Sequence, residues 1–144
     1  MSQYFDLGDE TLWNPSSGVS RRFRQQVALF EAETGLASGI GPMENDECRI
    51  DPAALEGFVN ALLAQHRDTG NPVLLALSEG FTVTVLVLAQ RAGIAVDWER
   101  LGAAPQGARE DVQRSAVAGV SASAEGRVWG AGLREKAREL GRGM

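Results

Sequence analysis

The sequence predicts a mostly helical α+β fold, in which three helices form the core and short strands precede them. Two segments, about 17–34 and 52–68, carry apolar residues at helical spacing, and a third long apolar segment covers about 72–92. The segment from Tyr4 to Trp13 alternates loosely between apolar and polar residues around a Gly-Asp-Glu break, which indicates two short strands. We therefore expect a three-helix core with a small N-terminal β-arm and a loosely helical C-terminal tail.

The first two helices have clear start and stop signals. A Pro-Ser-Ser turn precedes the first helix, and Gly35 is placed to end it. Asp51 can cap the second helix and Pro52 suits its first position, while Gly70 follows its end. The expected core positions of the two helices are Val19, Phe23, Val27 and Phe30 in the first, and Leu55, Phe58, Val59, Leu62 and Leu63 in the second.

The third apolar segment has two possible structures. Residues 81–88 are rich in β-branched side chains, as in a buried strand. The length from Pro72 to Arg91 and the spacing of its apolar residues favour a helix instead. One face of that helix holds Leu74, Leu77, Phe81, Val85 and Leu88, and we expect it to lie in the core.

The other segments have weaker patterns. Leu36 to Asp46 is expected to form a long loop, and residues 47–50 and 94–98 short strands. Residues 101–107 look like a linker, and residues 109–140 predict one or two helices with Trp129, Leu133 and Leu140 on one stripe, weakened by four glycines. We expect 1–96 to be a compact acidic helical domain, and 97–144 a linker with an Arg-bearing, partly helical extension.

Composition excludes several classes of protein. With 44% hydrophobic and 23% charged residues, the chain is typical of a globular protein, and its net charge of −5 argues against nucleic-acid binding. Its longest apolar run is interrupted by Glu79, which argues against a membrane span. Cys48 is the only cysteine and no secretory signal is visible, so we expect a cytoplasmic protein without an internal disulfide.

Several short motifs resemble those of a family of short actinobacterial proteins whose function is unknown. The likeness covers about residues 1–96, and it implies a cytoplasmic bacterial protein with a small, mostly helical domain. It implies no substrate, cofactor or catalytic residue. The motifs that carry it are Tyr4-Phe5-Asp6, Leu12-Trp13-Asn14-Pro15-Ser16, Gly39-Ile40-Gly41-Pro42-Met43, the Asp46-Glu47 pair before Ile50-Asp51, and Leu77 to Gly80.

Few side chains in this sequence suit catalysis or metal binding. The acidic loop with Glu44, Asp46 and Glu47 offers oxygen ligands for a hard cation, but its spacing does not match a calcium loop, and a solvated loop explains it as well. His66, the single histidine, suits an interaction with its helix C-terminus. Cys48 is expected to be buried, and with one His and one Cys the usual zinc sites of four nitrogen or sulfur ligands cannot form within one chain. We expect no cofactor and favour a protein that is not an enzyme.

Glu79 is the most informative polar residue, because a carboxylate inside an apolar helix needs a partner or a route to solvent. Candidate partners are Arg91, an arginine of the first helix, or Trp13. Tyr4, Asp6 and Trp13 in the opening segment are candidates for contact with a partner or ligand.

Two functional hypotheses follow from these residues. The first is a non-catalytic protein-interaction module, such as an immunity-type or regulatory binder. The second is a small ligand-binding protein or enzyme with a pocket around Glu79 and Trp13. A homodimer through the long apolar helix is an alternative to complete burial of that helix in a monomer.

Overall fold

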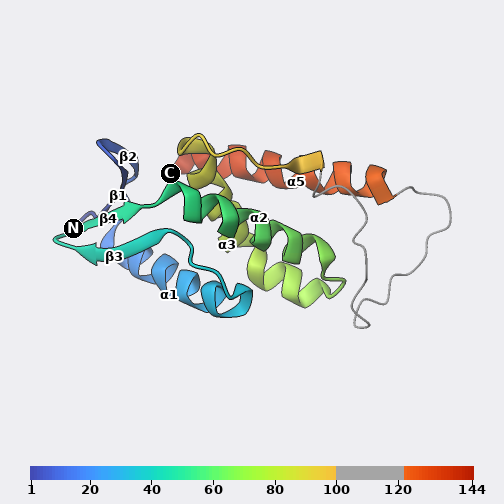
Figure 1. The fold of residues 1–144 in the computed structure, drawn as a ribbon, viewed down its shortest axis with the longest axis horizontal. Helices are drawn as coiled ribbons and strands as arrows, with labels where there is room; N and C mark the ends of the chain where they lie inside the picture. Colours follow the sequence, from blue (N-terminus) through green and yellow to red (C-terminus); the bar gives the residue numbers. More distant parts are fainter. Residues whose placement is uncertain (100–121) are drawn as a thin grey trace.

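The computed structural model describes residues 1–99 and 122–144, which form a mixed sheet at one end of a group of helices (Figure 1). The fold is therefore α+β, as predicted. Its strands are β1 (Tyr4–Leu7), β2 (Glu10–Trp13), β3 (Ile40–Glu44) and β4 (Glu47–Ile50), and its described helices are α1 (Ser17–Thr34), α2 (Pro52–Asp68), α3 (Pro72–Arg91) and α5 (Ala122–Gly143).

The sheet consists of two hairpins joined through a parallel pair of strands. Its order is β2-β1-β4-β3, with β1 parallel to β4 and antiparallel pairing within each hairpin. In the β3–β4 turn, Asn45 and Asp46 have φ values of 51° and 64°, the consecutive positive angles typical of a type I′ hairpin turn. This hairpin links the opening segment to the residues that precede α2.

The prediction of a long loop from Leu36 to Asp46 is wrong, because this segment contains strand β3. Gly41 and Pro42 hide this strand in the sequence, since both are unfavourable in strand interiors. The register between β3 and β4 shifts between Ile40 and Met43, which places the irregularity at the Gly-Pro pair. Strand β4 at Glu47–Ile50 is confirmed.

The starts of the helices follow local capping chemistry. The Asp51 carboxylate accepts hydrogen bonds from the amides of Ala53 and Ala54 at 3.0 and 3.2 Å. Asn71 caps α3 in the same way, and Gly35, with φ of 70°, ends α1 in the left-handed conformation. Residues 81–88 belong to α3, so the helical interpretation of this segment is confirmed.

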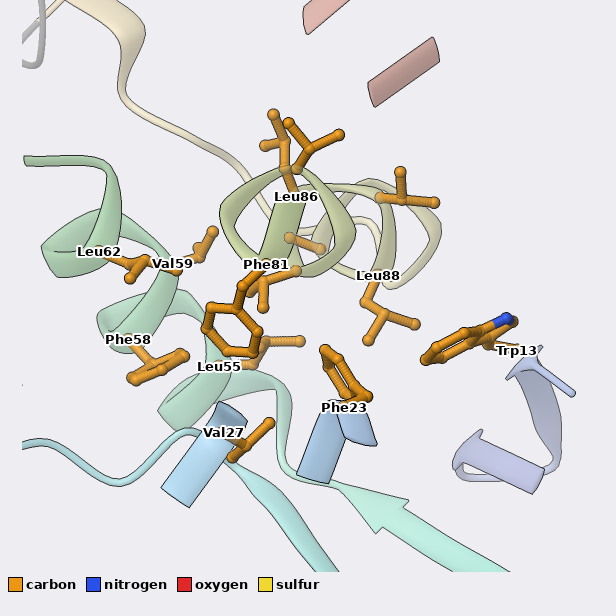
Figure 2. Packing of buried hydrophobic residues seen from close by; sticks show 14 of the residues in the cluster. Trp13, Phe23, Val27, Leu55, Phe58, Val59, Leu62, Phe81, Leu86 and Leu88 are labelled. Atoms are coloured by element: carbon orange, nitrogen blue, oxygen red, sulfur yellow. The ribbon is translucent and has the colours of Figure 1, made fainter. Parts of the chain in front are cut away.

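Phe81 is the centre of the core and joins three elements. Its ring stacks on Phe30 of α1 at a centroid distance of 4.4 Å and lies 5.6 Å from Phe23 and 6.4 Å from Phe58 of α2. Figure 2 shows Phe23, Phe58 and Phe81 converging between α1, α2 and α3. The aromatic cluster continues to Trp13, whose ring lies 5.3 Å from Phe23. The predicted core positions Phe23, Phe30 and Phe58 are therefore confirmed at this junction. Val19 is a correction, because it is 50% exposed near the start of α1.

The predicted three-helix core is incomplete, because α5 packs along α3 and contributes Leu133 and Ala137, which are 4% and 1% exposed. Arg91 of α3 joins three elements, since its guanidinium donates to the Leu12 carbonyl at 2.7 Å and to the Gly141 carbonyl at 2.9 Å. One of the glycines that weaken the helical pattern, Gly130, permits a close approach, because a Cβ there would lie 3.0 Å from the Trp98 ring.

Other expectations for the C-terminal part have mixed outcomes. The predicted stripe holds at Leu133 but not at Leu140, which is 37% exposed. Residues 94–97 have no regular secondary structure, so the predicted strand over 94–98 is wrong. The predicted linker at 101–107, and the part of the predicted helical region before residue 122, lie outside the described residues.

Candidate functional site

The candidates in the opening segment lie in the sheet. Trp13 is 7% exposed and packs between Phe5 and Phe23, so it covers the core and is not on an exposed patch. Tyr4 is 41% exposed on β1. The Asp6 carboxylate accepts a hydrogen bond from the Thr11 hydroxyl at 2.6 Å across the β1–β2 hairpin.

The acidic segment with Glu44, Asp46 and Glu47 forms the β3–β4 turn and the strand ends beside it. The Asp46 side chain accepts a hydrogen bond from Gln3 at 3.0 Å, and its carbonyl accepts one from the Tyr4 amide at 2.8 Å. In residues 1–99 and 122–144, no three His, Cys, Asp or Glu side chains are grouped so that they could hold a metal ion. Asp46 therefore has a structural role, because its contacts hold the opening segment against the sheet.

Cys48 is fully buried on β4, as predicted. Burial raises the pKa of its thiol to about 11, and the nearby Arg24 opposes this shift only in part. The thiol donates a hydrogen bond to the Gly41 carbonyl at 3.2 Å. A buried thiol with a raised pKa is a poor nucleophile, so Cys48 is a packing residue.

Glu79 forms an ion pair with Lys136, and this pair joins α3 to α5. Glu79 thus has a charged partner, which is one of the two expected outcomes, but this partner is none of the three expected. Glu79 precedes Arg91 by twelve residues, which is about 18 Å along a helix, and Arg91 marks where α3 meets β2. The structure thus does not bring Glu79 and Trp13 together.

This ion pair is part of a polar and aromatic cluster. The cluster consists of Glu79 of α3, Lys136 and Trp129 of α5, and His66 of α2. His66 is 8% exposed, and its ring lies 6.2 Å from that of Trp129. Neither Nδ1 of His66 nor Nε1 of Trp129 has a hydrogen-bond partner in the described part of the chain. Burial lowers the pKa of His66; Glu79 raises it and Lys136 lowers it further. His66 is therefore neutral at pH 7 and lies within electrostatic reach of the ion pair.

Residues of the C-terminal region extend this cluster outward. The ring of Trp98 lies 6.1 Å from that of Trp129, and the Arg134 guanidinium lies over Trp98 at 4.8 Å. Trp98, Arg134 and Lys136 were not among the predicted site residues. The signal that could have identified this region is that it holds two of the three tryptophans and the only lysine of the sequence.

The second notable feature is an exposed apolar surface on the first half of α3. Val73, Leu74 and Leu77 are 63%, 54% and 72% exposed, and we call these three residues the α3 face. Together with Ala76 they make this half of the helix apolar and accessible, whereas residues 81–83 and 85–89 are buried. Burial of Leu74 and Leu77 was expected from the sequence, so this is a correction.

The exposure of the α3 face follows from the length of α1. Leu74 and Leu77 precede Phe81 by seven and four residues, so they continue the side of α3 on which Phe81 lies. Phe30 covers Phe81, but α1 ends at Thr34, about one turn later. The apolar side of α3 therefore continues past the end of the helix that covers it.

The composition of α3 also bears on membrane association. In the described residues, α3 is the one helix long and apolar enough to cross a membrane, judged by length and composition alone. Its second half forms the core together with α1, α2 and α5. Core helices of globular proteins commonly meet the same criteria, so this observation is weak evidence for a membrane span.

The fold and the candidate site define a small α+β protein with a four-stranded mixed sheet, a helical core and a partly uncovered apolar helix. The chain belongs to the DUF6086 family, a family of unknown function whose model matches residues 1–144. The match thus extends beyond residues 1–96, where the sequence resemblance was expected to end. No curated protein and no solved structure matches the chain.

Proposed function

We propose that the protein is a non-catalytic interaction module that binds a partner protein through the α3 face. The observation that carries this proposal is the exposure of Val73, Leu74 and Leu77 on a helix whose second half is buried. Contiguous exposed apolar side chains are typical of protein-binding surfaces. Two further observations support a binding role: the buried thiol of Cys48 is a poor nucleophile, and the Glu79 carboxylate is paired with Lys136.

The energy available from the α3 face determines what kind of partner it needs. Full burial of a Val or Leu side chain stabilises by about 1.5–3 kcal/mol, and the exposed fractions of 54–72% leave about 1–2 kcal/mol per residue. Covering all three therefore yields about 3–6 kcal/mol, whereas association costs about 4–15 kcal/mol. A stable complex must add contacts beyond this face, with the face as its anchor.

The test compares Leu77→Asp with a matched control, Leu29→Asp. Leu29 is 54% exposed and projects from the side of α1 opposite its buried stripe. A photoreactive residue at position 77 identifies the partner in cells, and calorimetry then measures the binding of the purified pair. We expect Leu77→Asp to weaken binding by about 30-fold or more, which is about 2 kcal/mol, and Leu29→Asp to leave it unchanged. Equal affinities for the two variants would contradict the proposal.

The alternative function is a ligand-binding protein or enzyme. Its site would be the cluster of His66, Trp129, Glu79 and Lys136 and not the predicted pocket with Trp13. Its support is a pair of buried polar atoms that have no hydrogen-bond partner among residues 1–99 and 122–144, Nδ1 of His66 and Nε1 of Trp129. Buried polar atoms of this kind are commonly satisfied by ordered water, so they do not by themselves require a ligand. The interaction module is therefore the better-supported function.

We also propose a cytoplasmic, actinobacterial origin. The 13 arginines and single lysine, with abundant Ala and Gly, support a GC-rich bacterial genome. The single buried Cys48 suits a reducing compartment.

A further inference from the structure

We infer that the α3 face is covered by a second copy of this chain, so that the protein forms a twofold symmetric dimer in which the first halves of two α3 helices pack together. This inference rests on the proposed function, because it names the occupant of the same surface. The dimer is built on six exposed apolar side chains, Val73, Leu74 and Leu77 from each copy.

Charge favours a second copy. The segment from Pro72 to Ser78 contains no charged side chain, so two copies can meet there without opposing like charges. The nearest charge within the helix, Glu79, is paired with Lys136 of α5. The chain has a net charge of −5, which opposes self-association, and the α3 face adds no charge of its own to that repulsion.

Twofold symmetry also favours a second copy of the chain as the occupant of the α3 face. In a twofold interface each copy contributes the same patch, so every exposed apolar residue is buried twice. One α3 face is small for a stable interface with a polar partner, and pairing two faces doubles the apolar surface removed from water.

The place of the α3 face in the fold makes it accessible to another copy. It lies at the start of α3, immediately after the short connection from α2, and beyond the C-terminal end of α1. Two such helix starts can cross on a twofold axis, with Leu77 of one copy close to Leu77 of the other. A crossing of this kind brings together the most exposed residues of both copies.

The test measures the mass of the full chain in solution by light scattering and sedimentation over about 1 to 200 μM, a range that detects micromolar dissociation constants. We expect a dimer for the natural chain and for Leu29→Asp. Leu77→Asp and Leu77→Lys should each be monomeric. Because a symmetric dimer carries the substitution twice, a 30-fold effect per copy becomes a loss of about 1000-fold in dimer affinity.

Mixing the Asp and Lys variants provides a second measurement that misfolding cannot mimic. Opposite charges at position 77 across a twofold axis should attract, so the mixture should regain the dimer mass that each variant lacks alone. A natural chain that is monomeric over the whole range, or a dimer that Leu77→Asp leaves intact, would overturn the inference. A monomer would leave the proposed function untouched, because the cross-linking from position 77 tests binding to other proteins separately.

Discussion

Substitution of Leu133 by alanine tests whether α5 belongs to the cooperative core of this protein. Leu133 is 4% exposed, on a helix that packs along α3. The substitution removes three carbon atoms, worth about 0.8 kcal/mol each, and leaves a cavity, so we expect a loss of about 3 kcal/mol in the free energy of unfolding. With a urea dependence of about 2 kcal/mol per molar, the unfolding midpoint should fall by about 1.5 M.

The matched control is Leu140→Ala on the same helix, where the side chain is 37% exposed. We expect it to cost about 1 kcal/mol, because much of the removed surface is already in water. Unfolding is followed by circular dichroism, which reports on all helices together. If Leu133→Ala left the midpoint unchanged, α5 would not stabilise the core, and residues 97–144 would be the separate extension that the sequence predicts.

Two further predictions concern the buried titratable groups. At pH 8 the Cys48 thiol, with its pKa raised to about 11, should react with a disulfide reagent only through unfolding, so its rate should rise with urea; fast reaction in native buffer would contradict its burial. His66 has a lowered pKa in the folded state, so the stability that its neutral form contributes is complete above about pH 6.5 and is lost as pH falls through the folded pKa. Midpoints measured between about pH 7.5 and 5.5 should therefore decline more for the natural chain than for His66→Gln, and equal declines would refute the assignment.

The helices could be predicted because their signals are local. The caps at Asp51 and Asn71 and the stop at Gly35 act within a few residues, so the bounds of α1, α2 and α3 follow from short patterns. Strand β3 was missed because its stability comes from pairing with β4, which outweighs the poor strand propensity of Gly41 and Pro42. The packing of α5 was underestimated for a similar reason, since contacts with α3 offset its glycines.

The candidate site could be predicted only in part. The isolated carboxylate of Glu79 in an apolar helix correctly indicated a residue that needs a partner. Its partner Lys136 lies 57 residues away, however, and no local sequence pattern joins the two. Leu74 and Leu77 have the spacing of core residues, and their exposure depends on where a different helix ends. Sequence patterns show which side of a helix is apolar, whereas the length of a neighbouring element determines how much of that side is covered.

The small contribution of Leu77 to folding makes the role of the α3 face testable without loss of the fold. At 72% exposure, only about a quarter of its burial energy is realised within the monomer, or about 0.4–0.8 kcal/mol. Asp adds a helix-propensity cost of at most about 0.7 kcal/mol. Since small domains are stable by about 5–15 kcal/mol, Leu77→Asp should remain folded. A loss of association in this variant would therefore come from the surface itself, because the same side chain that contributes little to the fold is the most exposed of the three.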